Sequence, residues 1–233
     1  MTIPVIAIGS LKSSGTTTLA LTLAGVVAAA NIPILLIDAA RDGDATNWAA
    51  KASIPAKLRV ERETETVEIE RLVRGARRRG EAVIIDCGTL PEQLRFAERM
   101  ADTTLIPVRF SPLSAYAAIE TDRLFDETPG IGRPDRKRAF VASAITPIHS
   151  RVAKAVEGLI ARSTTQRLSV GLSLRAAYEA PFLTGGTLFG LDEADAPGLD
   201  RARAEAATLA YAVGLLQMRS EATPKSEISE IAA

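Results

Sequence analysis

Short, uninterrupted runs of apolar and β-branched residues recur along the 233-residue chain and constrain its fold more than any other feature. Runs of this kind are typical of strands that are buried on both faces, as in a parallel sheet, whereas a half-exposed strand alternates apolar and polar residues. The expected strands span residues 5–8, 34–37, 82–85, 105–108 and 139–142. The chain is therefore expected to build a mostly parallel, twisted sheet.

Segments with helical character separate these runs. We expect helices over residues 16–30, which are rich in Ala and Leu, over 61–79 and over 201–217. In residues 61–79, Glu precedes Arg, an order that suits the helix dipole. The alternation of strands and helices predicts a single α/β domain over residues 1–219, although length alone would also allow two small domains. Residues 220–233, with Pro224 and mixed charge, are expected to form a disordered tail.

Polar residues begin where three of the expected strands end, after Ile8, Ile37 and Ile85. Parallel sheets bind ligands at this edge. The first of these segments, residues 9–18, follows a strand and precedes a helix, with Gly15 and three Thr residues offering backbone N–H groups and hydroxyls suited to phosphate and Mg²⁺. A Ser/Thr cap at the start of a helix is the alternative interpretation of this loop. Asp38 and Asp86 each end an expected strand. They are expected either to face Mg²⁺ or only to cap the strand ends.

Five motifs in order along the chain resemble the ParA/MinD family of partition ATPases, whose P-loop deviates from the usual pattern. Its Lys-Gly-Gly-x-Gly-Lys-Thr-Thr loop corresponds here to the loop that ends in Gly15-Thr16-Thr17-Thr18. The other matching segments are residues 38–46 with the following Asn47-Trp48, 84–89, 101–113, and 175–180 with 185–188. The resemblance implies a P-loop NTPase-like fold, binding of ATP or ADP with Mg²⁺, and a homodimer that sandwiches two nucleotides.

The resemblance assigns nucleotide contacts to the residues of the loop and metal contacts to one hydroxyl and two carboxylates. The expected nucleotide-binding residues are Lys12, Ser13, Ser14, Gly15, Thr16, Thr17 and Thr18. The expected metal-binding residues are Thr17, Asp38 and Asp86. No catalytic residue is assigned.

The chain departs from the family at residues that bind phosphate and support hydrolysis. Thr16 replaces the P-loop Lys, and Ala40 replaces the Asp that positions the attacking water. Leu11 aligns with the signature Lys that reaches across the dimer, and Lys12 takes that role only if the loop is one residue shorter. The Asn that contacts adenine is also missing. Because phosphoryl transfer depends mainly on charge stabilisation and positioning, weak or absent ATP hydrolysis is expected even where nucleotide binds.

The charge balance and the scarcity of Cys and His limit the kinds of site that the chain can form. The chain has 28 basic and 28 acidic residues, which excludes a uniformly basic nucleic-acid-binding protein but allows a local patch. Its single Cys, Cys87, fits a reducing cytoplasm and is expected to pack as a small apolar residue, and its single His, His149, is expected to lie in a loop without chemistry. Trp48 either anchors the core or lies on a dimer surface. No apolar segment or tail suggests a membrane anchor.

Taken together, the residues and the resemblance predict a ParA-like protein for plasmid or chromosome partition or DNA transfer. It would act as a nucleotide-responsive dimer or scaffold with a partner protein. Non-specific DNA would bind through basic residues near the last helix, with Arg201, Arg203 and Arg219 as candidates, whereas the Arg residues of 71–79 are more typical of a solvated helix face. Two alternatives remain: a pseudo-ATPase that serves as an interaction module without nucleotide, and an active kinase-like or cobyrinate-synthase-like enzyme.

Overall fold

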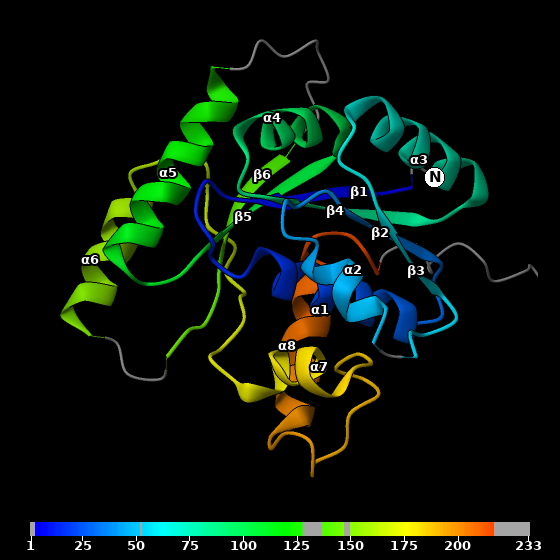
Figure 1. Cartoon of the computed structure of the whole chain (residues 1–233). Coiled ribbons are helices and arrows are strands. Elements are labelled where there is room, and N and C mark those ends of the chain that lie inside the picture. Colours follow the sequence, from blue (N-terminus) through cyan, green and yellow to red (C-terminus); the bar gives the residue numbers. More distant parts are fainter. Residues whose placement is uncertain (1–2, 52, 128–136, 147–149, 217–233) are drawn as a thin grey trace, which may run out of the picture.

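Six parallel strands form one sheet in the order β3-β2-β4-β1-β5-β6 (Figure 1). The computed structural model describes residues 3–51, 53–127, 137–146 and 150–216. The strands are β1 (Val5–Gly9), β2 (Ile34–Asp38), β3 (Leu58–Arg62), β4 (Ala82–Gly88), β5 (Thr103–Val108) and β6 (Lys137–Ala142). The predicted parallel sheet is confirmed, and five of its strands lie where the apolar runs place them.

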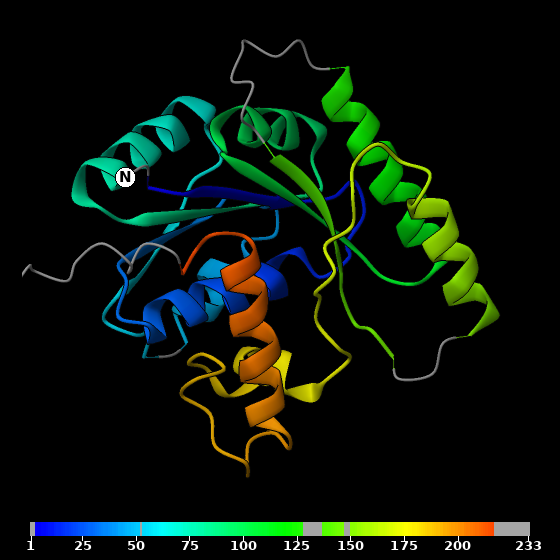
Figure 2. The ribbon, with the colours of Figure 1, turned by 180° about the vertical axis from the view of Figure 1, so that it is seen from behind.

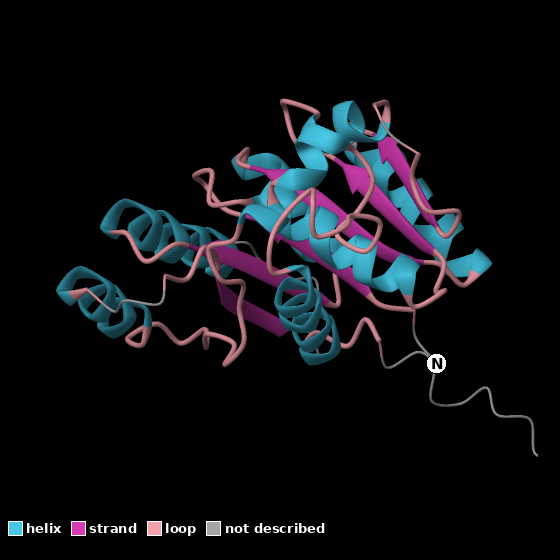
Figure 3. Ribbon diagram, turned by 90° about the horizontal axis from the view of Figure 1, so that it is seen from below, coloured by secondary structure: helices cyan, strands magenta, loops and turns pink. Residues whose placement is uncertain are grey.

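Helices cover both faces of the sheet (Figures 1 and 2). On one face lie α1 (Thr16–Ala29), α2 (Asp44–Ala49), α7 (Ala180–Thr184) and α8 (Leu199–Ala212). On the other face lie α3 (Thr66–Arg79), α4 (Pro91–Met100), α5 (Pro112–Asp126) and α6 (Arg151–Ile160). Seen from below, helices lie across the face of the sheet (Figure 3). A short 3₁₀ helix, Ala176–Tyr178, precedes α7. Burial on both faces explains why the strands are continuously apolar.

The predicted helix over residues 61–79 is wrong at its start. Residues Leu58–Arg62 form β3, the edge strand that pairs with β2, and the helix begins only at Thr66. An edge strand is half exposed and carries charged side chains, so its sequence lacks the continuous apolar run of the inner strands. The charged residues of β3 were therefore grouped with the charged helix that follows.

Helix α1 is the centre of one layer, because it is buried on nearly all sides and packs against α8. The predicted closing helix over 201–217 corresponds to α8, which begins two residues earlier and ends at Ala212. Cys87 is buried, as expected, and Trp48 is a core residue whose indole N–H donates to the Gly186 carbonyl. Residues 220–233, Arg219 and His149 lie outside the described residues. Within the described residues, no helix is long and apolar enough to cross a membrane.

Candidate functional site

The three polar loops predicted from the sequence meet at one edge of the sheet. Strand β4 lies between β1 and β2, with Asp86 opposite both Ile8 of β1 and Asp38 of β2. The loop after β1 leads directly into α1, so the start of this helix faces the same edge. The sheet therefore brings the phosphate-loop candidate and both carboxylates together.

Contacts with α5 and β6 hold the loop after β1 in place. The Leu11 N–H donates to Thr121 Oγ1 at 2.9 Å, and the Ser14 and Ser114 hydroxyls are 2.8 Å apart. Ser143, just after β6, donates its hydroxyl to the Ser14 carbonyl at 2.9 Å. Because these partners lie about 100 residues or more along the chain, the tertiary fold, rather than the loop itself, determines the shape of the loop.

The loop leaves a series of backbone N–H groups available at the start of α1. Gly15 has a left-handed conformation, with φ of 86°, and no side chain caps the helix. In the described part of the chain, the backbone N–H groups of residues 12–18 have no hydrogen-bond partner. The alternative interpretation of this loop as a Ser/Thr helix cap is therefore wrong. Free N–H groups at a helix start form a concavity suited to an anion.

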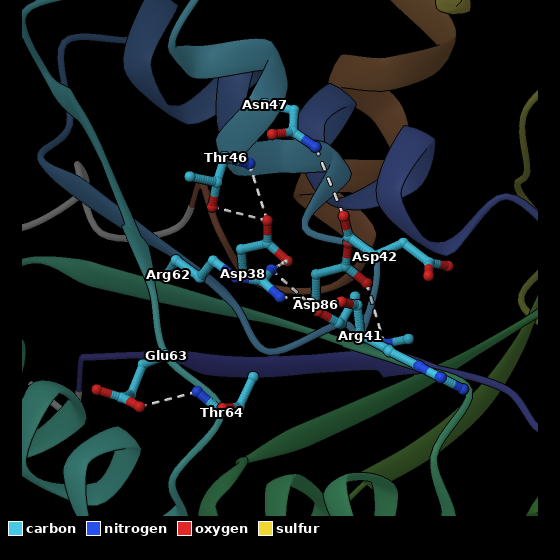
Figure 4. Close-up of polar contacts among 11 residues, drawn as sticks. Asp38, Arg41, Asp42, Thr46, Asn47, Arg62, Glu63, Thr64 and Asp86 are labelled. Carbon is cyan, nitrogen blue, oxygen red and sulfur yellow. Dashed lines mark hydrogen bonds and ion pairs between the residues drawn. The ribbon is translucent and has the colours of Figure 1, made fainter.

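Asp38 is fully buried at the end of β2, and its two carboxylate oxygens have different surroundings (Figure 4). Oδ2 accepts hydrogen bonds from both the backbone N–H and the hydroxyl of Thr46, each at 2.8 Å. Oδ1 has no hydrogen bond in the described residues and lies 3.6 Å from Nη1 of Arg62. The carboxylate is therefore fixed on one side and available to a cation on the other.

Asp86 is fully buried beside Asp38. Burial raises the pKa of its carboxyl to about 6, whereas the Thr17 hydroxyl and the Gly88 N–H favour ionisation, and the charges of Asp38 and Asp44 oppose it. Among the described residues, its Oδ2 atom has no hydrogen-bond partner. An unpartnered, buried carboxylate oxygen is costly, and a cation would satisfy it. Thr17, Asp38 and Asp86 thus lie together at this edge of the sheet.

Three residues that bear on the expected departures from the family, Thr16, Lys12 and Ala40, lie in the described part of this region. The Thr16 side chain is buried in the first turn of α1. Lys12 is exposed and, within the described residues, forms no ion pair. Ala40 is nearly buried and packs closely against Gly88, where a Cβ would lie 2.9 Å from the Ala40 Cβ. Position 16 therefore carries no positive charge, and position 40 carries no carboxylate.

Two hollows adjoin the loop. One, of about 410 Å³ and partly open to solvent, has walls that include Ser14, Thr18, Arg109, Ser143 and Arg175. The other, of about 850 Å³ and also open, lies along residues 15–18 and is bordered by Asp44, Glu179 and Leu183. The first lies between the loop and the segment after β6.

A partly buried polar network holds one wall of the smaller hollow. Glu205 of α8 accepts hydrogen bonds from the Ser173 N–H and hydroxyl, from the Arg175 guanidinium and from the Tyr178 hydroxyl, at 2.6–3.2 Å. Burial opposes ionisation of Glu205, but these hydrogen bonds hold its pKa below the ordinary value. Burial and the neighbouring Glu205 raise the pKa of Tyr178. The wall is thus attached to α8.

Three residues of this region were not predicted from the sequence: Arg62, Arg109 and Glu205. Arg62 was hidden because β3 was interpreted as part of a helix. Arg109 follows β5 directly, so its place at the ligand-binding edge of the sheet was a usable signal. Glu205 sits in an ordinary helical pattern, and no local signal distinguishes it from a solvated residue.

The chain is similar to known proteins in both sequence and fold. No family model matches the chain. Protein ParA of Rhizobium radiobacter is 26% identical over 191 residues, covering 79% of this chain and 85% of that protein. Apo McdA from Cyanothece has 14% identity and a TM-score of 0.70, covering 87% of this chain and 98% of that chain. The chain is ParA/MinD-like.

Further solved structures agree with this assignment. MinD from Aquifex aeolicus is 17% identical with a TM-score of 0.68, covering 90% of this chain and 97% of that chain. At these identities, the solved structures establish the fold alone: the chain has the fold of McdA and MinD. The resemblance and the fold class predicted from the sequence are therefore confirmed.

Proposed function

We propose that this ParA/MinD-like protein binds ATP or ADP with Mg²⁺, responds by dimerising, and hydrolyses ATP weakly or not at all. The observation that carries the proposal is the arrangement of free N–H groups at the start of α1 beside unpartnered carboxylate oxygens of Asp38 and Asp86. The N–H groups suit phosphates, and the carboxylates suit the cation that accompanies them. Two structures with this fold support it: a McdA–ATP complex and a cobyrinic acid a,c-diamide synthase with ADP and magnesium.

The protein donors alone form an incomplete site for a divalent cation, and phosphate oxygens would complete it. Within the described residues, no group of three or more His, Cys, Asp and Glu side chains could hold a metal ion. Thr17, Asp38 and Asp86 would hold the ion, directly or through water, while phosphate oxygens complete its shell. Bound Mg²⁺ would neutralise charge on the terminal phosphates. Ser13, Ser14, Gly15, Thr16 and Thr18 would contribute backbone N–H groups to the same phosphates.

Weak hydrolysis follows from two positions. Thr16 cannot supply the positive charge that a P-loop Lys places on the transferred phosphoryl group, and Ala40 cannot orient water. Arg62 instead lies beside Asp38, where it donates to the Ala40 carbonyl. We therefore place the function of this protein in binding and switching rather than in turnover.

Lys12 is the loop cation that the proposal assigns to the nucleotide, within one subunit or across the dimer. Lys12→Ala is expected to weaken Mg·ATP binding by ~10-fold, because it removes a charge-assisted contact. Isothermal titration calorimetry gives the affinity, and light scattering gives the mass with and without nucleotide. Lys57→Ala is the matched control, because exposed Lys57 precedes β3 and so lies at the opposite end of the strands. Equal affinities for the two variants would remove Lys12 from the site.

The second candidate function is an interaction module that needs no nucleotide. The replaced lysine at Thr16 favours it, as does the loop that α5 and β6 already hold in shape. The same titration separates the candidates: saturable heat with a doubled mass supports the nucleotide switch, and no heat at millimolar Mg·ATP supports the module. A kinase-like or synthase-like enzyme is a lesser alternative, since it would require steady turnover.

DNA is the further partner that we propose, in keeping with a cytoplasmic role in plasmid or chromosome partition or DNA transfer. Of the three candidate residues, Arg201 is exposed, whereas Arg203 donates to the carbonyls of Leu188 and Leu191. The Arg residues of α3 are largely paired with acidic neighbours, in agreement with a solvated face. Partner proteins belong to the same proposal, as the MinC:MinD complex of Aquifex aeolicus illustrates.

Dimerisation should concentrate the few free basic residues, so DNA binding is expected only with Mg·ATP and only at low salt. Raising the salt from 50 to 200 mM should weaken a gel shift at least ~10-fold, because each phosphate contact releases counterions. Arg201→Ala should reduce the shift further. A shift that is insensitive to salt, or equal without nucleotide, would contradict this part of the proposal.

A further inference from the structure

Arg62, the last residue of β3, closes the site from the side of the edge strand (Figure 4). Its Nη1 donates to the Ala40 carbonyl at 3.1 Å, and its Nη2 donates to the Arg41 carbonyl at 2.9 Å. The same Nη1 lies 3.6 Å from Oδ1 of Asp38, the oxygen without a hydrogen bond. One guanidinium therefore contacts the buried carboxylate and two carbonyls of the segment that follows it.

The segment is shaped to receive this guanidinium. Gly43 has φ of 69°, and a Cβ placed there would lie 2.3 Å from Nη1 of Arg62. Any larger residue would be strained in conformation and would displace the arginine. On the inner side, Asp38 bonds Thr46 of α2 through Oδ2. Asp38 directly precedes residues 39–43 and bonds Thr46 after them, and Arg62 holds the segment from the solvent side.

We propose that Arg62 is a positioning residue that locks residues 39–43 and shares the Asp38 carboxylate with a divalent cation. The contact with residues 39–43 needs no nucleotide, whereas the sharing of the Asp38 carboxylate rests on the proposed function. A guanidinium this close to Oδ1 reduces the negative potential there, and its half-exposed position moderates the effect. Arg62 therefore weakens the attraction of the site for a divalent cation. Binding of the cation, in turn, weakens the contact that holds residues 39–43.

Trypsin tests the lock without any ligand. Arg41 and Asp42, which flank the bond that trypsin would cleave, are exposed, but the Arg41 carbonyl accepts the Arg62 hydrogen bond. Arg62→Met is expected to accelerate cleavage after Arg41 by ~10-fold, since two charge-assisted hydrogen bonds are lost. Arg59→Met is the matched control: Arg59 lies on the same strand but pairs with Glu61 and Glu81. Mass spectrometry of the fragment ending at Arg41 follows the rate, and equal rates for the two variants would overturn the lock.

Manganese binding tests the shared carboxylate. Titration of Mn²⁺ alone, followed by electron paramagnetic resonance, is expected to show ~3-fold tighter binding to Arg62→Met than to the wild type, because a competing positive charge is gone. General damage to the fold would weaken binding instead. Unchanged or weaker binding in a folded Arg62→Met variant overturns the shared carboxylate.

Arg62→Lys keeps the charge but cannot bridge two carbonyls, so it separates the two halves of the inference. In this variant we expect faster cleavage after Arg41 and the same Mn²⁺ affinity as in the wild type. If Arg62→Met does not fold, Arg62→Lys replaces it in the trypsin test. Cleavage at the wild-type rate in Arg62→Lys would contradict the two-carbonyl lock. If no form binds Mn²⁺ or nucleotide, the proposed function and the shared carboxylate fail together, while the trypsin result still decides the lock.

Discussion

Asp86→Asn is expected to stabilise the ligand-free protein at pH 8 by about 2 kcal/mol while abolishing the stabilisation by Mg·ATP that the proposed function predicts. Asp86 is fully buried, with one oxygen unpartnered in the described structure, so its charge is costly to the fold. A pKa raised from the ordinary value of 3.8 to about 6 corresponds to about 3 kcal/mol, of which the unpaired amide of Asn would offset part. Urea unfolding measures the change.

The effect of Asp86→Asn should depend on pH in a defined direction. The folded state binds the Asp86 proton more tightly than the unfolded chain does, so the free energy of unfolding falls as pH rises between about 4 and 6. The full cost is present above about pH 6 and absent below about pH 4. The gain from Asp86→Asn should therefore be largest at pH 8 and vanish near pH 4.

Asp44→Asn is the control for Asp86→Asn, because it removes a nearby carboxylate that is exposed and should change stability little. A variant Asp86→Asn that is less stable than the wild type at pH 8 would show that the buried charge is better compensated than the geometry indicates. A gain of equal size at pH 4 would assign the effect to packing rather than to charge.

Thr16→Lys is expected to tighten Mg·ATP binding by ~10- to 100-fold, because it adds a charge-assisted contact to phosphate. Thr16 is the first residue of α1, at the place where the free N–H groups of the loop begin a helix. The gain requires that the loop already has the shape of a phosphate site. Calorimetry measures the affinity, and turnover should stay low because Ala40 still cannot orient water.

Ser13→Lys adds the same charge to the loop at an exposed position three residues earlier and is the matched control for Thr16→Lys. General attraction of an anion would improve binding equally in both variants. Tightening confined to Thr16→Lys would support a loop built for phosphate. No tightening in Thr16→Lys would indicate that the loop has lost that shape and would favour the interaction module.

The inner strands could be predicted because a strand that is buried on both faces is apolar at every position, which is visible in the sequence. Helix α1 could be predicted because its sequence is rich in Ala and Leu. The ligand-binding edge followed from where the apolar strands end, and this reasoning identified Asp38, Asp86 and the loop before α1. The closeness of Asp38 to Asp86 follows from the parallel register of β2 and β4. These features depend on local sequence and on general rules of α/β topology.

The edge strand could not be predicted by the same reasoning. Leu58–Arg62 contains two Arg and one Glu in five residues, and the charged helix α3 follows closely. Charge order along the chain does not distinguish an exposed strand from an exposed helix. Arg62 was lost with this strand, because its role depends on contacts with Asp38, Ala40 and Arg41 about 20 residues earlier.

The carboxylate of Glu205 connects two parts of the molecule that are distant in sequence. It holds Ser173, Arg175 and Tyr178, which line the smaller hollow, and it belongs to α8, which packs on α1. Arg201 lies one helical turn before Glu205 on the same helix. The Tyr178 hydroxyl also donates to the Ala202 carbonyl of α8, so a ligand that shifted this wall would strain several hydrogen bonds to the helix that carries Arg201.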